Sequence, residues 1–170
     1  MEINNQRKPE DKTQLYGNVL VKKNHERIIF RGKLDSLQSK FLVAQAIISN
    51  HSDNDKLITE LQDILNILRE MMRCDALNEE YKNDKILGMS HDESREHSHN
   101  PMKYYNIQQM LLPDYKMGIE YVLLNQLRSS IRELEIVAIN AEKKDLTREL
   151  NRLSSVLHIM MCKYLAGYYK

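Results

Sequence analysis

Hydrophobic residues recur at intervals of three or four along four long stretches, and this spacing limits the fold more than any other feature of the chain. The four stretches that share it cover residues 33–48, 53–77, 114–141 and 145–164, with approximate ends. This period places the apolar side chains on one face of an α-helix. Amphipathic helices joined by turns bury those faces against each other. We therefore predict an all-α, antiparallel helical bundle.

The residues before the first stretch lack this helical spacing. Residues 1–14 carry charge and Asn without a period, so we expect a mobile arm followed by one helical domain over residues 15–170. The segment 15–23 favours extended backbone, because Gly17 and Asn18 favour turns and its valines favour strands. We expect a loop there rather than a sheet.

The segment between the second and third stretches, residues 78–114, is too long for a simple connector in a compact domain. It contains one plausible helix, Ser90–His97, with Ser90 as the N-cap and Glu93 three residues later. Counting this short helix gives a five-helix bundle. A connection of this length is typical of a binding loop.

Composition excludes several function classes. The 170 residues suit one domain, and the formal net charge of +1 provides no overall field to attract nucleic acid, so any anion site must be local. Two cysteines, Cys74 and Cys162, are too few for a disulfide framework. With neither a signal peptide nor an apolar run long enough to span a bilayer, we expect a cytoplasmic protein.

Arg128, Arg132 and Glu135 share one face of the third long helix, because they are spaced i, i+4 and i+7. This face lies beside the apolar stripe. Two interpretations remain open from the spacing: a charge row on a solvated or interface surface, or a pair of guanidinium groups that bind phosphate oxygens.

Asp35 and Asn151 have similar alternatives. Asp35 can be an acid favoured near a helix N-terminus, and Asn151 an ordinary helix residue or a polar group reaching into a pocket. His91, His97 and His99 are close in sequence but lack any metal-site motif, so we expect no metal site. Phosphate-loop, dinucleotide and hydrolase motifs are also missing from the sequence.

Several runs coincide in order with one known family. The runs are Thr13–Ile28, Arg31–Gln38, Glu60–Leu65, Leu124–Glu135 and Leu150–Ser155. Together they resemble ATP:corrinoid adenosyltransferases. The middle region, with the runs Asp75–Leu77, Gly88–Glu93 and His99–Tyr104, is similar to the ethanolamine-utilisation branch of that family.

The resemblance implies a five-helix bundle assembled as a homotrimer, with active sites between subunits. It implies transfer of the 5′-deoxyadenosyl group of ATP to cob(I)alamin, with Mg²⁺ present and triphosphate released. Because the corrinoid cobalt is the nucleophile, the protein needs no catalytic triad. Expected partners are a corrinoid reductase and the ethanolamine ammonia-lyase pathway, with a bacterial microcompartment as an associated location.

The resemblance also carries residue roles on the nucleotide side. It assigns ATP binding to the residues that align with nucleotide-binding positions of the family, which are Thr13, Lys23, Arg132, Glu135 and Asn151. Of these, Arg132 is also implied as catalytic.

On the corrinoid side, the resemblance pairs Asp35 with Arg128, as catalytic residues that hold the subunit interface and the corrinoid site in register. It places Met110 and Leu112 against cobalamin, with Met110 standing where propanediol-type relatives have phenylalanine.

Two further departures bear on function. Residues 7–12 replace the Gly- and Asp-rich nucleotide loop of those relatives, so Arg7, Lys8 or Lys12 would have to contact ATP instead. The Cys-Cys-x-x-Cys metal motif of many ethanolamine-type relatives is not in this sequence, so we expect neither iron nor zinc. The alternative functions are a corrinoid- or nucleotide-binding bundle without turnover, and a purely structural subunit.

Overall fold

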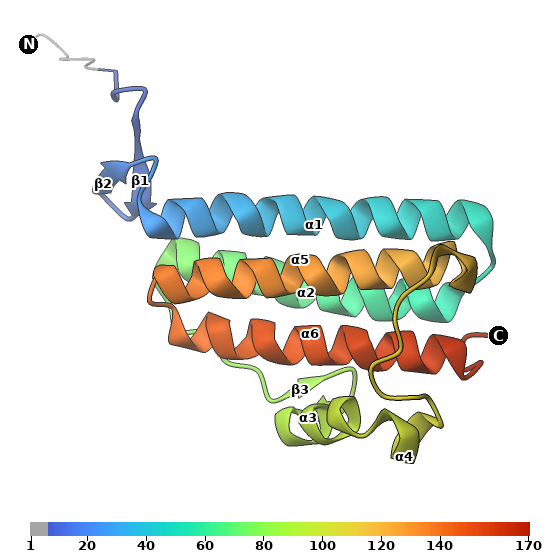
Figure 1. Cartoon of the computed structure of the whole chain (residues 1–170). Helices are drawn as coiled ribbons and strands as arrows, with labels where there is room; N and C mark the ends of the chain where they lie inside the picture. The colour runs from blue at the N-terminus through green and yellow to red at the C-terminus, as the bar shows by residue number, and fades with distance from the viewer. Residues whose placement is uncertain (1–6) are drawn as a thin grey trace, which may run out of the picture.

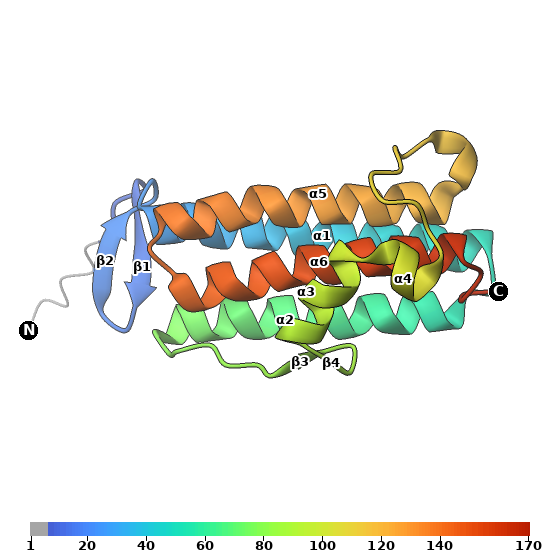
Figure 2. The same cartoon turned by 60° about the horizontal axis from the view of Figure 1, so that its bottom comes forward.

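Four long helices lie side by side in the computed structural model, which describes residues 7–170. They share a length of more than twenty residues and are α1 (Glu26–His51), α2 (Asp55–Leu77), α5 (Ile119–Asn140) and α6 (Lys144–Leu165). Helix α2 runs antiparallel to α1 and α6 runs antiparallel to α5, whereas α5 runs in the same direction as α2 (Figures 1 and 2). Their apolar faces meet in one continuous core, which confirms the mostly helical prediction.

The helix ends follow local chemistry. Helix α1 begins at Glu26, seven residues before the predicted start, because Phe30 is fully buried and continues the stripe of Leu34. Its N-cap is His25, whose side chain accepts the amide of Arg27. Helix α2 begins at Asp55, two residues after the predicted start, and ends at the predicted Leu77; its C-cap, Asn78, adopts a left-handed φ of 55°.

The expectation of no sheet before α1 is wrong. Strands β1 (Lys12–Tyr16) and β2 (Val19–Lys22) form an antiparallel hairpin, with Thr13 opposite Val21. Gly17 makes the turn at a φ of 48°, a conformation that glycine adopts without steric cost. The all-α class therefore needs correction to a helical bundle with small sheets. Of the predicted arm, residues 1–6 lie outside the described part, and its mobility stays a prediction.

The middle segment adds short elements outside the bundle. Strands β3 (Lys85–Ile86) and β4 (Met89–Ser90) form a second hairpin, followed by α3 (His91–His99) and α4 (Pro101–Tyr105). The predicted capping box is confirmed, since Ser90 and Glu93 bond reciprocally. Helix α3 packs against α6 (Figure 2). The described residues thus contain six α-helices, of which four build the long bundle.

A loop and the one-turn 3-10 helix η1 (Tyr115–Met117) connect α4 to α5. Within residues 7–170, every helix is too short or too polar to cross a membrane.

Candidate functional site

An open groove of about 730 Å³ lies where α5 turns into α6. We call it the basic groove, and the residues that line it are Glu135, Ile139, Glu142, Lys143, Lys144, Thr147, Arg148, Asn151 and Arg152. Two predicted nucleotide residues meet in it, because Asn151 Nδ2 donates to Glu135 Oε1 at 2.9 Å. Helices α5 and α6 therefore fix these two side chains against each other.

A smaller cavity of about 220 Å³ lies farther along the same two helices. We call it the loop pocket, and the residues that line it are Ile107, Gln108, Met110, Leu111, Leu112, Pro113, Tyr121, Arg128, His158, Met161, Cys162 and Leu165. Three predicted corrinoid residues, Met110, Leu112 and Arg128, are brought together here. Met110 and Leu112 are 88% and 82% exposed, so the loop displays apolar surface beside the pocket.

The two cavities are placed in register by helix geometry. On α5, Glu135 and Arg128 are seven residues apart (135 − 128), and on α6 so are His158 and Asn151 (158 − 151). Seven residues correspond to about 10 Å along a helix. Arg132, which is exposed, lies between the two cavities on α5. The α5–α6 face therefore presents a polar site and an apolar site a short distance apart.

Burial shapes the protonation of the loop pocket. Burial, with the nearby charge of Arg128, lowers the pKa of His158, which keeps the imidazole neutral near pH 7. Burial raises the pKa of the Cys162 thiol to about 11, and its Sγ lies 3.8 Å from His158 Nε2. Burial and then the charge of Arg132 lower the pKa of Arg128, which nonetheless stays charged. The pocket thus holds one cation among neutral groups.

Other predicted residues lie outside these cavities. Asp35 is exposed on α1, and the Arg128 guanidinium donates to Asn125 Oδ1, with its Nη2 at 2.9 Å. Within the described part of one chain, Asp35 and Arg128 form no ion pair, so their pairing between subunits stays a prediction. Thr13 lies in β1, and exposed Lys23 follows β2.

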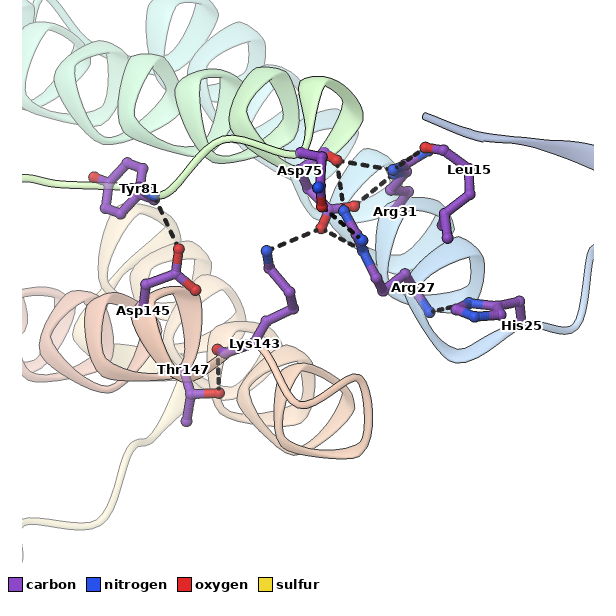
Figure 3. A network of polar contacts seen from close by, with 10 residues as sticks. Leu15, His25, Arg27, Arg31, Asp75, Tyr81, Lys143, Asp145 and Thr147 are labelled. Carbon is purple, nitrogen blue, oxygen red and sulfur yellow. Dashed lines mark hydrogen bonds and ion pairs between the residues drawn. The ribbon is translucent and has the colours of Figure 1, made fainter. Parts of the chain in front are cut away.

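A cluster around Asp75, which sequence reasoning did not assign to the site, joins the hairpin to the α5–α6 turn. The Asp75 carboxylate is fully buried and faces Arg27, Arg31 and Lys143 (Figure 3). Arg31 also donates to the carbonyl of Leu15 in β1. The sequence signal for this cluster is an acid, Asp75, at a position where the helical spacing predicts a buried side chain.

The histidines do not converge. His91 Nε2 lies 3.0 Å from Glu149 Oε2, whereas His97 Nδ1 lies 2.8 Å from the hydroxyl of Tyr105. Glu149 is buried and also accepts from Asn83, so it holds the β3–α3 segment on α6. Among the described residues, no three His, Cys, Asp or Glu side chains are grouped to hold a metal ion.

Comparison with known proteins finds relatives over most of the chain. Corrinoid adenosyltransferase EutT of Salmonella typhimurium strain LT2 is 31% identical over 163 residues, covering 91% of this chain. Its counterpart in Escherichia coli K12 is 32% identical over the same length. The chain spans 59% of the length of each of these relatives.

The model of the family described as cobalamin adenosyltransferase matches residues 3–164, which include the hairpin, three of the long helices and all of α6 except its last residue, Leu165. The chain therefore belongs to the cobalamin adenosyltransferase family.

Proposed function

We propose that this chain transfers the 5′-deoxyadenosyl group of ATP to cob(I)alamin, forming adenosylcobalamin and releasing triphosphate. The observation that carries the proposal is the α5–α6 face, where the basic groove and the loop pocket lie about 10 Å apart. A nucleoside triphosphate in the groove can extend its ribose toward a corrinoid at the pocket. Membership of the family and the names of the relatives support the same reaction.

The reaction requires no covalent bond between the protein and either substrate. The cobalt(I) electron pair forms a bond to C5′ of the ribose, and the C5′–O bond breaks, with its electrons leaving on the triphosphate. The protein has to align the two substrates and stabilise the charge that grows on the leaving group. Arg132 lies between the two cavities, where a guanidinium can meet that charge.

On the nucleotide side, Glu135 and Asn151 offer an acceptor and an amide inside the groove. Mg²⁺ is usually held by one or two carboxylates together with phosphate oxygens, and Glu135 fits this requirement. When bound, Mg²⁺ would neutralise part of the triphosphate charge. Thr13 and Lys23 would act from the hairpin, at the same end of the bundle as the groove (Figure 1).

On the corrinoid side, the exposed side chains of Met110 and Leu112 would cover an apolar face of the macrocycle. Arg128 would provide the charge that the pocket holds.

The proposed assembly is a homotrimer with sites between subunits, in which Asp35 of one subunit pairs with Arg128 of the next. Supporting it, α1 exposes apolar side chains at Leu42, Val43 and Ile47, each more than a third exposed. A corrinoid reductase and ethanolamine-pathway proteins, in the cytoplasm or at a microcompartment, belong to the same proposal.

The test is an anaerobic assay with ATP, Mg²⁺ and chemically reduced cobalamin, following the light-sensitive cobalt–carbon bond by absorbance. We expect product and triphosphate in equal amounts. Arg132→Ala should lower turnover at least tenfold, about 1.4 kcal/mol in the barrier, because it removes charge stabilisation from the leaving group.

Arg69→Ala is the matched control, since Arg69 is exposed on α2, away from both cavities. Equal turnover of the two variants would remove Arg132 from the site. Binding of both ligands without product would favour a binding bundle without turnover.

A further inference from the structure

The carboxylate of Asp75 is shared unequally by three cations. Its Oδ1 accepts Arg27 Nε at 3.0 Å, and its Oδ2 accepts Arg31 Nε at 2.6 Å. The ammonium of Lys143 lies 3.6 Å from Oδ1, beyond hydrogen-bond distance. Three positive charges face one negative charge, so the cluster keeps a net charge of +2 (3 − 1). Lys143 is the cation that Asp75 holds least firmly.

The backbone of Lys143 is held in place by the end of α5. Glu142 adopts a left-handed φ of 55°, and its amide donates to Ile139 O at 2.9 Å. The amide of Lys143 donates to Ala138 O at 3.1 Å, which completes a Schellman motif. The carbonyl of Lys143 accepts the hydroxyl of Thr147 at 2.9 Å. The side chain therefore leaves from a fixed position, between Asp75 and the groove.

Lys143 also lines the basic groove, where cations outnumber acids. Four cations line it, namely Lys143, Lys144, Arg148 and Arg152, against Glu135 and Glu142, which leaves +2 (4 − 2). Arg27 and Arg31, which contact Asp75 together with Lys143, add positive charge near the lysine (Figure 3). A polyanion is the ligand class that this charge favours, and 730 Å³ is a size that suits a nucleotide.

We propose that Lys143 is a dedicated polyphosphate-binding residue, which turns from its loose contact with Asp75 to the phosphate oxygens of a nucleoside triphosphate in the basic groove. This inference rests on the proposed function for the identity of the nucleotide. The α5–α6 turn would then supply a phosphate ligand in a chain that lacks a glycine-rich nucleotide loop.

The neighbouring Lys144 provides the contrast. Both lysines line the groove, but the Lys143 side chain is 17% exposed and Lys144 is exposed. An exposed lysine is screened by salt and loses more side-chain freedom when it binds. Lys143 is partly desolvated and close to two arginines, so its contact with an anion should be stronger.

The experiment measures binding of inorganic triphosphate by calorimetry at constant ionic strength. The variants are Lys143→Gln, Lys143→Arg and Lys144→Gln. Lys143→Gln should raise the dissociation constant at least tenfold, while Lys143→Arg and Lys144→Gln should stay within about threefold of the wild type. Thermal unfolding of each variant shows that the fold is intact.

Two results would overturn the inference. One is an equal loss in Lys143→Gln and Lys144→Gln, which would mean that only the summed charge of the groove attracts the anion. The other is a wild-type chain that does not bind triphosphate at millimolar concentration. Neither depends on turnover: a chain that binds triphosphate through Lys143 but makes no adenosylcobalamin would keep this inference and reject the proposed function.

Discussion

The basic groove and the loop pocket are built by different means on the same two helices. In the groove, directional bonds hold the side chains, as in the contact between Asn151 and Glu135 and the Schellman motif before Lys143. At the pocket, a loop displays Met110 at a left-handed φ of 62° and leaves its side chain 88% exposed. The difference teaches that the side chains of the polar site are held by bonds within one chain, whereas the apolar site presents surface for a ligand or another chain to cover.

The groove end should be the more sensitive to loss of one residue. Asp75→Ala leaves Arg27 and Arg31 without their carboxylate in a partly buried position. We expect a loss of about 3 kcal/mol in the free energy of unfolding, because an uncompensated buried charge costs that order of energy. Urea unfolding measures the change.

The control for this variant is Asp63→Ala, since Asp63 is an exposed acid on the same helix. It should change stability by less than about 0.5 kcal/mol. Similar losses in the free energy of unfolding of the two variants would show that the buried Asp75 stabilises the fold no more than an exposed acid does.

A substitution at the loop pocket should change corrinoid affinity but not the stability of the fold. Met110→Asp places a charge on the exposed apolar surface, so corrinoid affinity should fall about tenfold, or 1.4 kcal/mol. The midpoint of unfolding should hardly move, because Met110 buries little surface. Lys163→Gln, outside the pocket on α6, also lowers the net charge by one unit and controls for charge. An unfolded Met110→Asp variant would mean that the loop is part of the core.

The smallest expected effect concerns pH. Because burial lowers the pKa of His158 in the folded chain, the unfolded chain takes up the proton more readily. Above the unfolded-state pKa of about 6.5, His158 is neutral in both states and does not lower the free energy of unfolding. As the pH falls below this value, the unfolded chain binds the proton first and the free energy of unfolding decreases.

Comparing urea unfolding of the wild type and His158→Gln from pH 7.5 to pH 5 isolates this group. The wild type should lose stability relative to the variant as the pH decreases. A difference that stays constant with pH would place His158 in a hydrated environment and weaken the contrast with the polar groove.

Sequence reasoning reached the two cavities by different routes. The spacing of Arg128, Arg132 and Glu135 placed them on one helix face, and the family resemblance supplied Asn151, Met110 and Leu112. Which cavity each residue enters depends on how α6 and the 107–113 loop lie against α5, and this packing is not encoded in a local period. The start of α1 was also missed, because Arg27 and Arg31 interrupt the apolar pattern before Lys33.

What the sequence alone determined is the set of four long helices and the capped helix α3, since side-chain periodicity and capping act over a few residues. The tertiary structure decided the hairpin, whose strands need each other's backbone bonds and the anchor from Arg31 to Leu15. It also decided the Asp75 cluster. Arg27 and Arg31 on α1, Asp75 on α2 and Lys143 before α6 come from three distant parts of the chain, and only packing of the bundle ends can bring one buried charge to the three others.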